Sequence, residues 1–167
     1  DDPVCRRFAA THDVITYGTA PDARVRAVDI TAHDGSYTFA IERDGQRLGT
    51  IDLPLRGIHN VRNATAVVAM ALEVGVTFDV AASALARFGG VARRFDVRGS
   101  VAGATLVDDY GHLPSEIGAV LSAARSSGDG WKRVICVFQP NRFNRMAVMW
   151  PDYASAFVDA DVVVLTD

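Results

Sequence analysis

Residues 105–114 read TLVDDYGHLP, and residues 134–145 read VICVFQPNRFNR. Each stretch opens with an apolar run that predicts a buried strand, and the apolar spacing of residues 114–126 predicts a helix between them. When a helix connects two parallel strands, the carboxyl ends of both strands point to the same edge of the sheet. The polar residues that follow the strands are two acids, a tyrosine, a histidine and two arginines, so we expect them on one rim. Such a rim suits an anionic substrate.

An antiparallel meander is predicted upstream. Residues 24–56 alternate apolar and polar side chains, and this pattern places Val25 and Ala27 on the inward face. Asp34-Gly35 and Asp44-Gly45 separate the runs and are typical hairpin turns.

Two helices are predicted after the meander. Helical spacing of apolar residues favours one helix from Gly57 to Gly75 and another over residues 80–88. Gly89-Gly90 then breaks the pattern, and we place a domain boundary between Gly89 and Arg93. The expected fold class is α/β.

The composition excludes several classes of protein. A net charge of −3 argues against a nucleic-acid surface, and the apolar runs fall short of the ~18 residues that membrane insertion needs. Cys5 and Cys136 are typical of buried thiols in a reducing cytosol, so we expect a cytoplasmic protein. The chain opens without Met and stops on the strand-like run of residues 161–167, which predicts an internal piece of a longer protein.

Two asparagines lie at the start of the first predicted helix, in the run GIHNVRN of residues 57–63. Asn60 is a good N-cap, so helix capping explains it. Asn63 lies on the same face, and its amide offers the donor and acceptor that match an adenine edge. Capping and ligand binding both remain open for this pair.

Charged pairs have two readings as well. Arg93-Arg94 is either a solvated pair at a domain junction or a source of guanidinium contacts to a phosphate. Asp108-Asp109 either caps a strand end or touches ribose hydroxyls or a metal ion.

The polar residues that directly follow the two strands favour function over the structural alternative. His112 is either a buried, hydrogen-bonded histidine or a functional group in a polar loop, and the loop favours function. Arg142 and Arg145 lie three residues apart and are suited to clamp a carboxylate or phosphate.

Motifs for several chemistries are absent from the sequence. There is no His-Glu-x-x-His, Cys-x-x-Cys or Gly-x-Ser-x-Gly, and we predict no metal ligand. Lys132 is the only lysine and enters a predicted strand, so the chain has no P-loop lysine.

Five segments, in this order, make the chain resemble the Mur ligase family: Tyr17-Gly18, residues 57–63, FGGVARRF at 88–95, DDYGHLPSEI at 108–117 and FQPNRFNR at 138–145. The family has an N-terminal UDP-binding domain, a central ATPase domain and a C-terminal Rossmann-like domain. The resemblance implies that residues 1–91 are the rear part of the central domain, with antiparallel strands and two helices. Residues 92–167 would be a truncated Rossmann-like parallel-sheet domain. The P-loop and the magnesium-binding acid would lie upstream of Asp1.

The resemblance also implies an activity. It is that of an ATP-dependent amide ligase that joins L-alanine to UDP-N-acetylmuramate through an acyl phosphate, in peptidoglycan precursor synthesis. ATP and Mg²⁺ would be the cofactors, with the metal ligands outside this chain, and no nucleic acid or membrane would be involved. The isolated residues would be inactive because half of the phosphate site is missing.

Site residues follow by position from the resemblance. Three would face adenine: His59, Asn60 and Asn63. Four would hold the muramyl substrate and the alanine carboxylate: Tyr110, His112, Arg142 and Arg145. Arg94 would reach the terminal phosphates and Asp109 the ribose. Arg94 and His112 are the expected catalytic residues.

Two positions depart from the family pattern. Leu113 and Asn141 stand where the family has histidines, and both positions would lie by the amino-acid pocket. Two alternatives therefore stay open. One is a murein-peptide recycling ligase of the same family, and the other is a non-catalytic nucleotide-binding relative.

Overall fold

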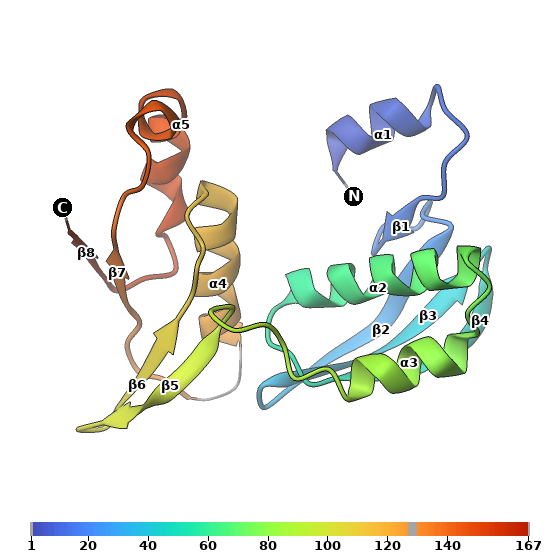
Figure 1. Cartoon of the computed structure of the whole chain (residues 1–167), viewed down its shortest axis with the longest axis horizontal. Coiled ribbons are helices and arrows are strands. Elements are labelled where there is room, and N and C mark those ends of the chain that lie inside the picture. Colours follow the sequence, from blue (N-terminus) through green and yellow to red (C-terminus); the bar gives the residue numbers. More distant parts are fainter. Residues whose placement is uncertain (1, 127–129, 167) are drawn as a thin grey trace. The chain divides into compact units, whose positions relative to one another are not determined.

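A hydrophobic core organises each of the two units of the chain, Asp1–Gly89 and Gly90–Asp167. The structure is a computed structural model, and it describes residues 2–126 and 130–166. The first unit contains, in order, α1 (Pro3–Ala9), β1 (Tyr17–Gly18), β2 (Val25–His33), β3 (Ser36–Arg43), β4 (Gln46–Leu53), α2 (Ile58–Glu73) and α3 (Phe78–Ala86) (Figure 1). The second contains β5 (Asp96–Val101), β6 (Ala104–Asp108), α4 (Pro114–Ser126), β7 (Ile135–Phe138), α5 (Phe143–Ala156) and β8 (Val162–Leu165).

The predicted meander is confirmed in the first unit. Its sheet has the order β1-β2-β3-β4, with β1 parallel to β2 and the other pairs antiparallel. Asp44 and Gly45 both have positive φ angles, 50° and 80°, as a tight hairpin turn of matching twist requires. Val25 and Ala27 are buried as expected.

Both predicted helices of the first unit pack on this sheet and on each other (Figure 1). α2 buries the face formed by Val61, Ala64 and Val68, which follows helical spacing. The second helix, α3, begins two residues earlier than predicted and ends at Ala86. This packing fixes the first turn of α2, where the candidate adenine contacts lie.

The second unit departs from the predicted strand pairing. Among the described residues, β6 pairs antiparallel with β5, and β7 pairs in parallel with β8. The prediction that β6 and β7 are adjacent parallel strands is therefore wrong. The tight turn at Ala102 and Gly103, with φ angles of 49° and 80°, folds the chain directly back on itself and pairs β6 with β5. Figure 1 shows β6 and β7 running toward the same side of the unit.

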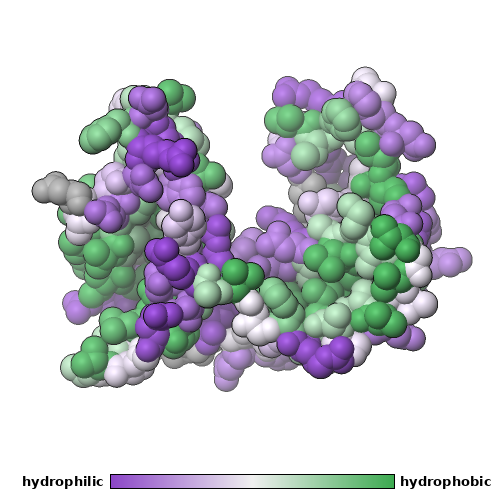
Figure 2. Space-filling model, in the orientation of Figure 1, coloured by the Kyte–Doolittle hydropathy of each residue, from purple (hydrophilic) through white to green (hydrophobic). Residues whose placement is uncertain are grey.

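The apolar strands of this unit are not buried as predicted. Val137 is 68% exposed and Leu165 is 65% exposed, and Figure 2 shows apolar surface over β7 and β8. A parallel sheet is normally covered on both faces. Here α4 and α5 pack together around Ile117, Leu121, Phe138 and Tyr153 and cover one face.

The two cysteines differ from the expectation of two buried thiols. Cys5 is exposed, because α1 contributes no buried residue. Cys136 is partly buried on β7, and this burial raises the pKa of its thiol. Among the helices of the described residues, none has both the length and the apolar character needed to cross a bilayer.

Candidate functional site

The Asp109 carboxylate folds the segment that follows β6. Its Oδ2 accepts the backbone N–H of Phe95 at 2.8 Å, and its Oδ1 accepts the N–H of Gly111 at 2.6 Å. A Cβ on Gly111 would come within 2.9 Å of Asp109 Oδ1, so this close approach favours glycine. Asp109 therefore holds the arginine segment before β5 next to the loop after β6.

A second carboxylate, Glu116, lies in the first turn of α4. Its Oε2 accepts the backbone N–H groups of His112 at 2.9 Å and of Leu113 at 3.0 Å. Burial alone would raise the pKa of Glu116. The two N–H bonds, with the positive charge of Arg94, lower this pKa below its ordinary value instead.

Arg94 lies between these two carboxylates. Its Nη1 is 3.9 Å from Asp109 Oδ1, and its Nη2 is 3.6 Å from Glu116 Oε1. Both distances exceed that of a hydrogen bond, and the Arg94 side chain is 47% exposed. The two carboxylates thus orient the guanidinium group without hydrogen-bonding to it, so its N–H donors remain able to bind an anion.

The His112 ring is oriented by the loop itself. Its Nδ1 lies 3.0 Å from the carbonyl oxygen of Tyr110, which can only accept, so Nδ1 carries the hydrogen. The Tyr110 ring meets the His112 ring edge-on at 5.5 Å. The neutral ring then has Nε2 as its acceptor nitrogen, with no hydrogen bond to any residue that the structure describes.

Tyr153 connects this loop to α5. Its hydroxyl donates to the carbonyl oxygen of His112 at 2.6 Å, and the side chain is 6% exposed. The loop is therefore held from two sides, with Glu116 on its N–H groups and Tyr153 on a carbonyl group.

The two arginines that follow β7 lie at the start of α5. Arg142 is the N-cap residue with a φ of 66°, and its carbonyl accepts the N–H of Arg145 at 3.0 Å. Neither side chain forms an ion pair with any residue of the described ranges. From Arg145 to Tyr153 the helix rises roughly 12 Å. The structure thus brings Arg94, Asp109, Tyr110 and His112 together, and places Arg145 about two turns and Arg142 about three turns of α5 away from the Tyr153 contact.

The asparagines of the first unit lie on one face of α2. The N-cap of α2 is Gly57, with a φ of 85°, so Asn60 does not cap the helix. The Asn60 amide donates to the Arg56 carbonyl at 2.8 Å, and the Asn63 amide donates to Asn60 Oδ1 at 3.3 Å. Asn63 is exposed, and its own Oδ1 accepts no bond from a described residue. His59 is half-buried and directly precedes Asn60 in the first turn of α2.

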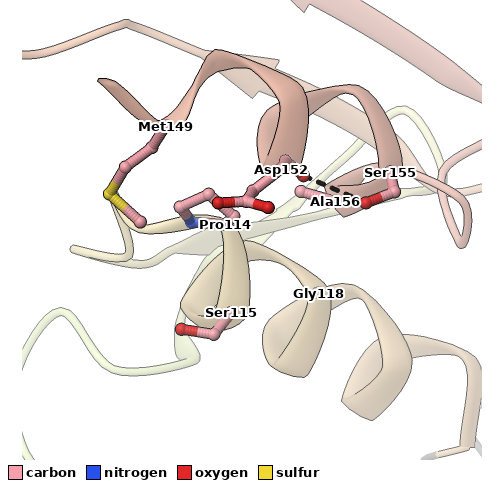
Figure 3. Close-up of a pocket in the computed structure, with 7 residues that line it drawn as sticks. All are labelled: Pro114, Ser115, Gly118, Met149, Asp152, Ser155 and Ala156. Carbon is pink, nitrogen blue, oxygen red and sulfur yellow. Dashed lines mark hydrogen bonds between the residues drawn. The ribbon is translucent and has the colours of Figure 1, made fainter. Parts of the chain in front are cut away.

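A groove of about 340 Å³ runs between α4 and α5, and its lining residues are shown in Figure 3: Pro114, Ser115, Gly118, Met149, Asp152, Ser155 and Ala156. The two helices lie near each other at Gly118, where a Cβ would lie 3.8 Å from the Ala156 carbonyl oxygen. The groove is lined mainly by small and apolar groups, and it lies beside the His112 loop rather than within the carboxylate cluster.

Sequence reasoning gave no role to Glu116 or Tyr153. Glu116 could have been found as the acidic residue at the third position of a helix, a capping signal. No local signal identifies Tyr153, because its partner lies in another segment. Among residues 2–126 and 130–166, no group of three His, Cys, Asp or Glu side chains is placed to hold a metal ion.

Two family models match the chain. The Mur ligase middle domain matches residues 1–71, and the Mur ligase glutamate ligase domain matches residues 93–167.

Individual relatives point the same way. The chain is 46% identical to a UDP-N-acetylmuramate–L-alanine ligase of Pelobacter propionicus over all of its own length and 36% of that protein. It is 48% identical to the enzyme of the same name from an Anaeromyxobacter species over 92% of the chain and 33% of that protein. The chain thus spans about a third of the length of the curated relatives it matches.

Solved structures show a related fold. The crystal structure of a UDP-N-acetylmuramate-alanine ligase from Thermotoga maritima has a TM-score of 0.75 and 29% identity, over 90% of this chain and 33% of that one. A murein peptide ligase from Psychrobacter arcticus has a TM-score of 0.63 and 25% identity, over 90% and 31%.

Proposed function

Because this chain belongs to the Mur ligase family, we propose that it is part of an ATP-dependent ligase that joins L-alanine to UDP-N-acetylmuramate in peptidoglycan precursor synthesis. The observation that carries the proposal is the 46% identity, over the whole chain, to a protein of that name. We assign residues 1–91 to the central ATP-binding domain and residues 92–167 to the first part of a Rossmann-like C-terminal domain. Such an enzyme works in the cytoplasm, where ATP and nucleotide-linked sugars are available.

Binding of ATP is the first task of these residues. Asn63, with an exposed amide beside Asn60, offers a donor and an acceptor to adenine, and His59 lies in the same turn. The Asp109 carboxylate accepts two backbone N–H groups and has lone pairs left for ribose hydroxyls. Mg²⁺, which we place on ligands outside this chain, would neutralise phosphate charge.

Arg94 is the residue best placed to act in phosphoryl transfer. ATP supplies the phosphoryl group that activates the lactyl carboxylate of the sugar substrate. Charge on a phosphoryl group in transfer is stabilised by fixed cations. Asp109 and Glu116 orient the Arg94 guanidinium without hydrogen-bonding to it, so its N–H donors can bind the phosphoryl oxygens as their charge develops.

The acceptor side is assigned to four residues: Tyr110, His112, Arg142 and Arg145. An arginine fork matches the carboxylate of L-alanine, and neither Arg142 nor Arg145 is paired with a described acid. His112, with Nδ1 bonded to a carbonyl group, presents Nε2 as an acceptor for a substrate N–H or O–H group. Leu113 and Asn141 stand where the family has histidines, so the amino-acid specificity is tested directly in the assay below.

An assay of phosphate release on the full-length protein tests the proposal. Release should require ATP, UDP-N-acetylmuramate and L-alanine together. Release that requires a tripeptide in place of L-alanine would identify a murein-peptide recycling ligase. Binding of ATP without release under any of these conditions would identify a non-catalytic relative.

A further inference from the structure

We propose that Glu116 is a positioning residue that fixes Arg94 and His112 relative to each other, so that one carboxylate couples the phosphate contact to the acceptor-substrate contact. The inference rests on the function proposed above. It adds a residue to which the sequence motifs assigned no role.

The two carboxylate oxygens of Glu116 contact different partners. Oε2 accepts the N–H groups of His112 and Leu113 at 2.9 and 3.0 Å and so fixes the backbone that carries the His112 ring. Oε1 faces the other way, with Arg94 Nη2 at 3.6 Å. Glu116 also lies within 3.6 Å of His112 Nδ1. One side chain therefore contacts both residues that we assign to catalysis.

Helix capping explains only part of this arrangement. The carbonyl of Leu113 accepts the N–H of Ile117 at 2.9 Å, so Leu113 is the N-cap position, and its bond to Glu116 is half of an ordinary capping box. The second bond, to the His112 N–H, reaches outside the helix. The contact with Arg94 joins α4 to a segment that precedes β5. A cap needs neither of these contacts.

If Glu116 acted through its charge alone, its removal would change the binding of ATP in the direction opposite to that expected from positioning. A carboxylate near Arg94 lowers the positive potential that an anionic phosphate meets. If Glu116 acted only through its charge, its removal would strengthen the binding of ATP. If it acts by placing the guanidinium, its removal would weaken productive binding. The sign of the change in the KM for ATP separates the two accounts.

Glu116→Gln in the full-length protein makes this test. The amide oxygen can still accept the backbone N–H groups, while the charge that attracts Arg94 is lost. We expect the KM for ATP to rise and kcat to fall, together by about fivefold, the value of one partly exposed ion pair. Glu116→Ala should in addition raise the KM for UDP-N-acetylmuramate or L-alanine, because the His112 backbone is released.

Asp96→Asn is the matched control. Asp96 also accepts a backbone N–H, from Arg93, and pairs with an arginine, Arg98, at 3.0 Å. Its side chain is 27% exposed, against 28% for Glu116, and it has no assigned contact with substrate. Its replacement should leave kcat and the KM values for all three substrates unchanged.

Hydrogen–deuterium exchange supplies a readout that does not depend on turnover. A peptide that covers residues 110–117 should exchange faster in Glu116→Ala than in the wild type, and much less so in Glu116→Gln. An inactive wild-type protein would overturn the proposed function, but the exchange measurement would still test the positioning role of Glu116. The positioning role is overturned if Glu116→Gln lowers the KM for ATP, if its constants match those of Asp96→Asn, or if exchange is unchanged in Glu116→Ala.

Discussion

Arg93 and Arg94 are adjacent in the chain, yet their guanidinium groups do different things. Arg93 lies 3.4 Å from Asp108 and 4.8 Å from the centre of the Tyr110 ring, so its charge is used within the loop. Arg94 lies farther from that ring, at 5.9 Å, and faces two acids beyond hydrogen-bond distance. The difference makes Arg94 the residue that can change partners when an anion arrives.

Alanine substitution of each arginine in the full-length enzyme tests this difference. We expect Arg94→Ala to lower kcat for phosphate release by about a hundredfold or more, as the loss of a fixed transition-state donor does. Arg93→Ala should change kcat by no more than about fivefold, because it loses an exposed ion pair and a cation–π contact. Equal losses in the two variants would mean that Arg94 has no special role.

Asn63 and Arg142 should separate nucleotide binding from acceptor binding. Asn63→Ala is expected to raise the KM for ATP about tenfold through lost hydrogen bonds, while the KM for L-alanine stays near normal. Arg142→Ala should do the reverse, because a carboxylate loses its guanidinium partner. Steady-state kinetics with each substrate varied in turn checks both. A collapse of ATP affinity in Arg142→Ala would show that the site is divided wrongly.

At the scale of elements, Asp161 ties three of them together. Its Oδ2 accepts the Val134 N–H before β7 and lies 2.6 Å from Nη2 of Arg125 near the end of α4, and Asp161 itself precedes β8. The Val134 N–H bond, and then the bond from Arg125, hold the pKa of Asp161 below its ordinary value of 3.8. A depressed carboxyl pKa stabilises the fold above the unfolded value, and this stability is lost as the pH falls through the folded pKa.

Acid titration of stability checks this contact. At neutral pH the wild type should unfold at a higher urea concentration than Asp161→Asn, and the gap should narrow as the pH falls below 3.8 and through the lowered pKa of Asp161. Asp159→Asn is the control, because it is the backbone carbonyl of Asp159 that accepts from Arg125. If the difference in urea midpoint between the two proteins stayed constant with pH, the Asp161 carboxylate would not be the source of the stabilisation.

Strands and helix starts also show how much of the fold could be predicted from the sequence. The meander followed from local signals, since Asp34-Gly35 and Asp44-Gly45 set the turns and alternation set the inward face. The pairing of β6 and β7 was wrong because an apolar run does not say which strand lies beside it. Of the two readings left open for Asn60, helix capping is excluded, because Gly57 is the N-cap residue of α2. The roles predicted for the residues of the site loop stay predictions, and the long-range contacts of Glu116 and Tyr153 have no signature in a single sequence.

At the scale of the whole molecule, the two units have cores of unequal quality. In the first, Phe39 and Ile41 are 0% exposed. In the second, the apolar side chains of β7 and β8 remain largely exposed. Since buried apolar area is the main source of stability, we expect the second unit to be the weaker one in this chain.

Tryptophan fluorescence can report the weaker unit alone. Trp131 and Trp150 are the two tryptophans of the chain, and both lie after Gly90. In urea, the fluorescence transition should come at lower denaturant than the transition in far-ultraviolet circular dichroism, which senses both units. Phe39→Ala should lower the free energy of unfolding of the first unit by about 3–5 kcal/mol, so that the later transition shifts to lower urea. The midpoint of the fluorescence transition should stay unchanged. Coincident transitions would show that the chain unfolds as one cooperative body.

Pro151 lies inside α5, between the arginines at its start and Tyr153 near its end. Proline has no N–H group, so the carbonyl four residues earlier, that of Ala147, loses its helical partner, and a helix bends most easily at such a gap. The last turn of α5 is anchored to the His112 carbonyl by the Tyr153 hydroxyl. A bend at this gap would move Arg142 and Arg145 while leaving the Tyr153 contact with the His112 loop in place.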